Sequence, residues 1–186
     1  KWKRNPILGW AANSVVGILL FATGWFLVMS NNNEGSILFI DVHMFIYMMP
    51  YLLCFSSVSL LTSLPDMKGD IDSGDRTFPV AFGKKNTIYL SLIMVCIALL
   101  LSFESRDPLA STAIVVSLPF FIITAFRQLE KDILRAIRYP IFILNFFAFT
   151  VYPWLFVPLI IIYLISKYYY WHRFDLHYPT FLVDND

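Results

Sequence analysis

The chain has 186 residues, of which 58% are hydrophobic and 15% are charged, and its formal net charge is only +1. A chain this close to neutral lacks the basic excess with which proteins bind nucleic acid, so no nucleic-acid partner is expected. The mean hydropathy of +0.65 is high for a whole chain. This composition indicates a membrane protein.

Five stretches without Asp, Glu, Lys or Arg follow one another along the chain, each with 18 to 29 residues: 5–33, 42–65, 86–103, 108–126 and 139–166. A helix needs about 20 mostly apolar residues to cross the hydrocarbon core of a bilayer. In lipid, only helices and closed barrels satisfy their own backbone polar groups. The sequence therefore predicts an all-α, polytopic transmembrane helical bundle with five spans.

The last of these stretches allows two interpretations. Pro140, Pro153 and Pro158 interrupt residues 139–166, so that one kinked span competes with a re-entrant hairpin. Two full spans would need about 40 residues, and we therefore predict one span. The charged residues 127–138 before it are predicted to form a short amphipathic helix at the membrane surface, with its acidic side chains in solvent.

Residues 66–83 form a polar segment between two apolar stretches, with four aspartates, one lysine and one arginine. Each such charge costs about 2.5–3.5 kcal/mol at the centre of a membrane-spanning helix, so that six would cost roughly 15 kcal/mol or more. The polar segment is therefore predicted to be a loop in water. A loop this acidic at a membrane surface is suited to binding a cation.

Asp66 and Asp70 are the predicted metal ligands of the polar segment. They are four residues apart, so their carboxylates point the same way on a helical turn. Mg²⁺ prefers oxygen ligands, often one or two carboxylates together with substrate phosphates and waters. Lys68, Arg76 and Lys84 are close by in the sequence and could bind phosphate oxygens. The other two aspartates could equally be solvated, paired with the arginine or bound to metal.

The basic residues predict the orientation of the protein. With five spans, the chain before the first span, the polar segment with the two lysines after it, and residues 127–138 share one side, and they carry 11 of the 14 lysines and arginines. The positive-inside rule places this side in the cytoplasm. Lys167 and Arg173 are then predicted on the opposite side, and residues 174–186 are predicted to form a polar tail.

Two asparagines, Asn13 and Asn145, lie inside predicted spans. An asparagine in a membrane-spanning helix commonly hydrogen-bonds a neighbouring helix. Both are therefore predicted to join helices rather than to bind substrate.

The polar segment resembles the second aspartate-rich motif of the UbiA-type intramembrane prenyltransferases. That motif has a D-x-x-x-D core, a glycine, a basic residue followed by Thr or Ser, and a glycine that opens the next helix. The matching residues run from Leu64-Pro65-Asp66 through Gly69-Asp70 and Gly74-x-Arg76-Thr77 to Val80-x-x-Gly83. Residues 1–6, which read KWKRNP, resemble the end of the family's Y-x-x-x-K region.

The resemblance implies a single transmembrane prenyltransferase domain over residues 1–186. It also implies Mg²⁺ as cofactor, and transfer of a prenyl group from an isoprenoid diphosphate to an aromatic or other lipophilic acceptor, as in quinone or prenyl-lipid biosynthesis. The site residues that it implies are Asp66 and Asp70 for catalysis and metal binding, and Lys3, Lys68, Arg76 and Lys84 for the diphosphate.

The family's first motif, N/D-D-x-x-D in form, has no counterpart in this sequence. Two spans, a motif and three further spans correspond to the C-terminal part of the family. We therefore predict that about five of nine expected helices are present, that the domain is N-terminally incomplete, and that these residues alone are inactive. Two alternatives stay open: an enzyme like the CDP-alcohol phosphatidyltransferases, which also cluster aspartates, and a non-enzymatic transport or structural subunit of the membrane.

Overall fold

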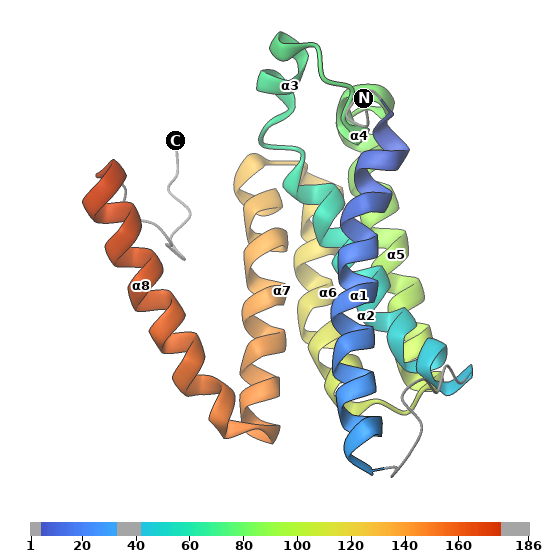
Figure 1. Ribbon diagram of the computed structural model, residues 1–186. Helices are drawn as coiled ribbons and strands as arrows, with labels where there is room; N and C mark the ends of the chain where they lie inside the picture. Colours follow the sequence, from blue (N-terminus) through green and yellow to red (C-terminus); the bar gives the residue numbers. More distant parts are fainter. Residues whose placement is uncertain (1–4, 33–41, 176–186) are drawn as a thin grey trace.

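The computed structural model describes residues 5–32 and 42–175, which form an all-α structure (Figure 1). Its helices are α1 (Pro6–Asn32), α2 (Val42–Thr62), α3 (Met67–Ser73), α4 (Phe78–Phe82), α5 (Lys84–Glu104), α6 (Pro108–Arg127), α7 (Glu130–Val151) and α8 (Phe156–Phe174), with the 3-10 turn η2 (Pro153–Leu155) before α8. Six of the described helices are long and apolar enough to cross a membrane, the last one together with η2. The predicted all-α polytopic bundle is confirmed.

The predicted number of five spans is wrong, because residues 139–166 do not form a single span. α7 ends at Val151, and α8 begins only after η2. Pro153 begins η2, since proline suits the first turn of a helix but has no backbone N–H to extend a preceding one. Pro140, also predicted to interrupt this stretch, instead lies inside α7. α7 also begins nine residues earlier than predicted, at Glu130, so that the two helices have 22 and 19 residues. Both are therefore close to the length that a full span needs.

The predicted surface helix over residues 127–138 is also wrong, since these residues form the end of α6, the turn after it and the first part of α7. Gln128 turns the chain with a left-handed φ of 53°. Asp132, expected in solvent, is only 1% exposed. Arg127 Nε and Arg135 Nη1 each lie 3.2 Å from one of its carboxylate oxygens. This pairing allows the charge to be buried and joins the two helices.

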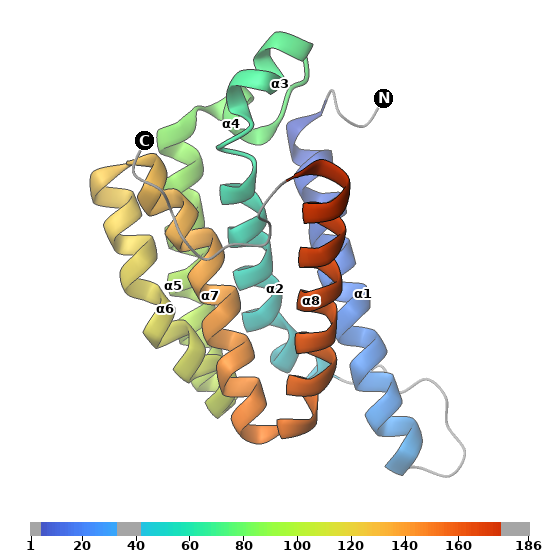
Figure 2. The ribbon, with the colours of Figure 1, turned by 90° about the vertical axis from the view of Figure 1, so that its left-hand side faces the viewer.

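α2 lies in the middle of the bundle, in contact with α1, α5, α6 and α7 (Figure 2). Small residues bring the helices close together, as is common in membrane bundles. Ser57 on α2 and Ser91 on α5 are both fully buried, and their hydroxyl oxygens are 2.7 Å apart. α8 is different, because it diverges from α7 (Figure 1) and none of its residues is buried.

The six spans change the predicted position of the C-terminal basic residues. The polar segment, the beginning of α1 and the end of α8 lie at the same end of the bundle, here named the polar end (Figure 1). Lys167 and Arg173, in the last turns of α8, therefore lie towards the polar end and not opposite the polar segment. Of the described lysines and arginines, only Arg106 lies at the other end, the distal end. Most of the predicted polar tail lies outside the described residues.

Candidate functional site

The polar segment, predicted to be a loop, contains the short helices α3 and α4. The backbone N–H of Asp70 donates to the carbonyl of Asp66 at 2.9 Å, so the two aspartates are one helical turn apart, as predicted. Gly74 ends α3 with a φ of 74°, and Gly83 joins α4 to α5 with a φ of 86°. Glycine adopts these left-handed conformations without a steric cost. The two short helices keep the charges beyond the ends of the long apolar helices.

Thr77 holds the carboxylate of Asp70 in place. Its hydroxyl donates to Asp70 Oδ2 at 2.8 Å, and the backbone N–H of Asp75 donates to the Asp70 carbonyl at 2.9 Å. Both bonds fold the chain after Gly74 back onto α3. A carboxylate has about four lone-pair sites, so a single bond from Thr77 leaves acceptor capacity for a cation.

A polar pocket of about 210 Å³ lies between the polar segment and the ends of α1 and α2 at the polar end. Asp70, Asp75 and Arg76 line it from the polar segment, while Asn13 on α1 and Ser59 on α2 line it from the bundle. Carboxylates beside a guanidinium suit a ligand that combines anionic groups with a cation. The polar pocket thus brings together two predicted site residues, Asp70 and Arg76, and adds Asp75, whose role the sequence left open.

The other predicted site residues lie elsewhere. Asp66, Lys68 and Lys84 are not among the residues that line the polar pocket. Asp66, directly before α3, and Lys68, within α3, are both exposed. Lys84 is the first residue of α5 and is half-buried. Lys3 lies outside the described residues. The assignment of the three lysines to the diphosphate stays a prediction.

The donor atoms at the polar pocket fit a magnesium ion. Carboxylate oxygens are the ligands that Mg²⁺ prefers, and its protein sites commonly have only one or two of them, completed by phosphates and waters. Asp70 and Asp75 supply such oxygens in the polar pocket, and Asp66 lies one turn from Asp70. Within residues 5–32 and 42–175, no three His, Cys, Asp or Glu side chains lie close enough together to hold a metal.

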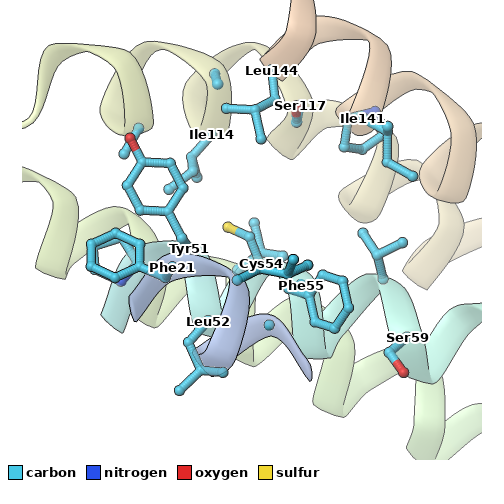
Figure 3. A pocket seen from close by; sticks show the side chains of 18 of the residues that line it. Phe21, Tyr51, Leu52, Cys54, Phe55, Ser59, Ile114, Ser117, Ile141 and Leu144 are labelled. Atoms are coloured by element: carbon cyan, nitrogen blue, oxygen red, sulfur yellow. The ribbon is translucent and has the colours of Figure 1, made fainter. Parts of the chain in front are cut away.

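An apolar cavity of about 620 Å³, partly open to the outside, lies between helices of the bundle next to the polar pocket (Figure 3). Mostly apolar side chains from α1, α2, α5, α6 and α7 line it. Asn13 and Ser59 line both spaces, and Asn13 Nδ2 donates to Ser59 Oγ at 3.2 Å. This pair therefore marks the boundary between the polar pocket and the apolar cavity.

The asparagine prediction holds for one of the two residues. Asn13 joins α1 to α2 through Ser59, as predicted, and it also lines the site. Asn145 instead donates to the carbonyl of Ile141 in its own helix at 2.7 Å.

Four polar residues of the polar pocket were not predicted as site residues from the sequence: Asn5, Ser59, Ser63 and Thr77. Ser59 and Ser63 are four residues apart and therefore share one face of the chain at the end of α2. That spacing could have indicated a polar face directed at the motif. Thr77 belongs to the motif, but its bond to Asp70 depends on the turn at Gly74.

The fold and the site define a class of protein: a multi-pass helical membrane protein with a charged pocket at the end of an apolar cavity. Residues 1–146 match the model of the UbiA prenyltransferase family. The chain therefore belongs to the UbiA prenyltransferase family, which implies prenyltransferase activity in a membrane and supports this prediction over both alternatives. The match ends before α8, although the resemblance was expected to cover nearly the whole chain. No curated protein and no solved structure gave a match.

Proposed function

We propose that this protein transfers a prenyl group from an isoprenoid diphosphate to an aromatic or other lipophilic acceptor in a Mg²⁺-dependent reaction. The observation that carries this proposal is the contact between the charged polar pocket and the apolar cavity at Asn13 and Ser59. An isoprenoid diphosphate has the same two parts, an anionic head and an apolar chain. The cavity volume of about 620 Å³ also lies in the range of small-molecule sites.

The head of the donor would bind in the polar pocket. The guanidinium of Arg76 can donate two parallel hydrogen bonds to phosphate oxygens. Asp66 and Asp70 would hold Mg²⁺, and Asp75 is a third candidate because it lines the same pocket. When bound, Mg²⁺ would neutralise the diphosphate and stabilise it as a leaving group. The hydrogen bond from Thr77 would hold the Asp70 carboxylate in position to bind Mg²⁺.

The chain of the donor would lie in the apolar cavity. The reaction breaks the allylic carbon–oxygen bond, whose electron pair leaves with the diphosphate, and forms a bond to the acceptor, which then loses a proton. The developing allylic cation must be kept away from water, and the apolar lining of the cavity excludes water. Aromatic rings attract cations, and Phe55, four residues before Ser59 on α2, and Phe121 on α6 supply such rings to the cavity.

We also propose that the polar end faces the cytoplasm. All described lysines and arginines except Arg106 lie towards this end, and cytoplasmic ends of membrane proteins carry an excess of both residues. The donor head would then come from the cytoplasm and the acceptor from the bilayer. This arrangement suits the synthesis of quinones or other prenyl lipids.

The experiment that tests the proposal is prenyl transfer in membranes that contain the full-length protein. The reaction combines a labelled isoprenoid diphosphate, Mg²⁺ and a panel of aromatic acceptors. We expect a labelled lipid and free diphosphate, both of which disappear when EDTA removes the metal. Arg76→Ala should raise the KM for the donor, whereas Arg106→Ala, at the distal end, is the matched control. Folded protein that gives no product with any pair of substrates would overturn the proposal.

A further inference from the structure

We infer that an aromatic plug at the distal end of the apolar cavity limits the length of the prenyl chain that the protein accepts. The plug consists of Phe21 and Trp25 from α1 and Tyr47 and Tyr51 from α2. This inference rests on the proposed function, since it identifies which isoprenoid diphosphates the cavity can take.

The four rings of the plug form a continuous group between α1 and α2. The ring centroids of Phe21 and Tyr51 are 5.9 Å apart, those of Phe21 and Trp25 are 6.2 Å apart, and those of Trp25 and Tyr47 are 6.1 Å apart. Such separations are in the range where aromatic rings attract one another. Phe21 and Tyr51 form the face of the plug that lines the cavity.

The plug lies at the end of the cavity away from the polar pocket. Figure 3 shows Phe21 and Tyr51 at one end of the cavity and Ser59 at the other. Ser59 and Tyr51 are eight residues apart along α2, which corresponds to about 12 Å. A prenyl chain whose diphosphate occupies the polar pocket enters beside Ser59 and runs towards the plug. A chain that is too long for this path meets the rings of Phe21 and Tyr51.

Tyr51 is fixed in this position from outside the cavity. Its hydroxyl donates to Asp107 Oδ2 at 2.7 Å. The other oxygen of Asp107 accepts bonds from the backbone N–H groups of Leu109 and Ala110, at 2.9 and 3.1 Å, at the start of α6. Hydrogen bonds to a carboxylate are roughly twice as strong as neutral ones. The ring of Tyr51 therefore cannot move aside without breaking a strong bond to a residue that the helix terminus itself holds.

The test compares donors of increasing length, namely geranyl, farnesyl and geranylgeranyl diphosphate, with the full-length protein in membranes. The quantity measured is the ratio of kcat/KM for the longer donor to that for the shorter one. Tyr51→Ala opens the plug and should raise this ratio about tenfold or more, because even one methylene group changes selectivity by roughly 10–200-fold in a tight apolar site. Tyr51→Phe keeps the ring but loses the bond to Asp107, and it should shift the ratio in the same direction by less.

Phe103→Ala is the matched control, because Phe103 is an aromatic residue near the distal end of α5 that is 59% exposed and does not line the cavity. This control should leave the ratio unchanged. If the wild-type protein transfers prenyl groups but Tyr51→Ala and Tyr51→Phe both keep its ratio, the plug does not set the length and the inference is overturned. If Tyr51→Ala does not fold, an unchanged ratio in Tyr51→Phe and Phe21→Leu overturns it equally. Wild-type protein that uses none of the donors would instead overturn the proposed function.

Discussion

Replacing Thr77 with valine tests how the structure orients Asp70. The substitution removes the hydroxyl that lies 2.8 Å from Asp70 Oδ2 and preserves the shape of the side chain. Loss of a hydrogen bond that orients a metal ligand costs roughly 10–100-fold in metal affinity or activity. This range corresponds to about 1.4–2.7 kcal/mol at 1.36 kcal/mol per factor of ten. We therefore expect the Mg²⁺ concentration for half-maximal transfer to rise by about 10–100-fold in Thr77→Val.

The assay is prenyl transfer at saturating donor and acceptor across a Mg²⁺ titration. Thr77→Ser keeps the hydroxyl and should stay close to wild type. Thr112→Val controls for the loss of a threonine hydroxyl as such, because Thr112 donates to the carbonyl of Pro108 within its own helix, at the distal end. A Thr77→Val protein with the wild-type Mg²⁺ requirement would show that Asp70 needs no hydrogen bond from Thr77 to bind the metal.

Two further predictions concern the fold. With six spans, cysteines placed at Ser73 and His172 should react with a membrane-impermeant maleimide from the same side of the membrane. A cysteine placed at Arg106 should react from the other side. Labelling of Ser73 and His172 from opposite sides would contradict the number of spans. Asp132→Ala removes the buried partner of two arginines, so the free energy of unfolding should fall by about 1–3 kcal/mol. The measurement is Tm in detergent. The control Asp72→Ala, at an exposed position, should leave Tm nearly unchanged. An equal Tm for both variants would contradict the stabilising role of the buried Asp132.

The sequence predicted those parts of the structure that depend on local charge and local conformation. Six charges within residues 66–83 place the polar segment outside the apolar helices whatever the rest of the chain does. The last glycine of the motif, Gly83, comes directly before α5, as the resemblance implied, and it has a positive φ of 86°. The spacing of Asp66 and Asp70 also predicted one helical turn, which the bond between their backbones confirms.

The number of spans could not be derived from uncharged stretches alone. Residues 130–138 carry several charges, yet they form the first turns of α7 at the polar end, where charged side chains reach water or find partners. Asp132 shows why this was missed: its burial depends on Arg127 from the preceding helix and Arg135 one turn further on. A pattern of hydrophobic residues contains no information on such pairing.

The shape of the site was beyond sequence reasoning for a similar reason. The chain has 18 Phe, 10 Tyr and 5 Trp residues, and most of them could equally face lipid or the core. Tyr51 contributes to the cavity because its hydroxyl meets Asp107, which is 56 residues away. Asn13 and Ser59, 46 residues apart, meet only because α1 packs against α2. Contacts of this kind are set by helix packing and not by a local pattern.

The role of the polar pocket in binding the diphosphate can be measured by comparing Asp70→Asn with Asp72→Asn in the prenyl-transfer assay at limiting Mg²⁺. Both substitutions remove one negative charge from the same short helix, but Asp70 lines the polar pocket, whereas Asp72 is exposed and does not line it. If the polar pocket holds the metal and the diphosphate, kcat/KM for the donor falls by at least about 100-fold in Asp70→Asn, the upper end of the loss from a disturbed metal ligand. Asp72→Asn then stays close to wild type. Wild-type kcat/KM in Asp70→Asn would mean that this pocket is not the diphosphate site.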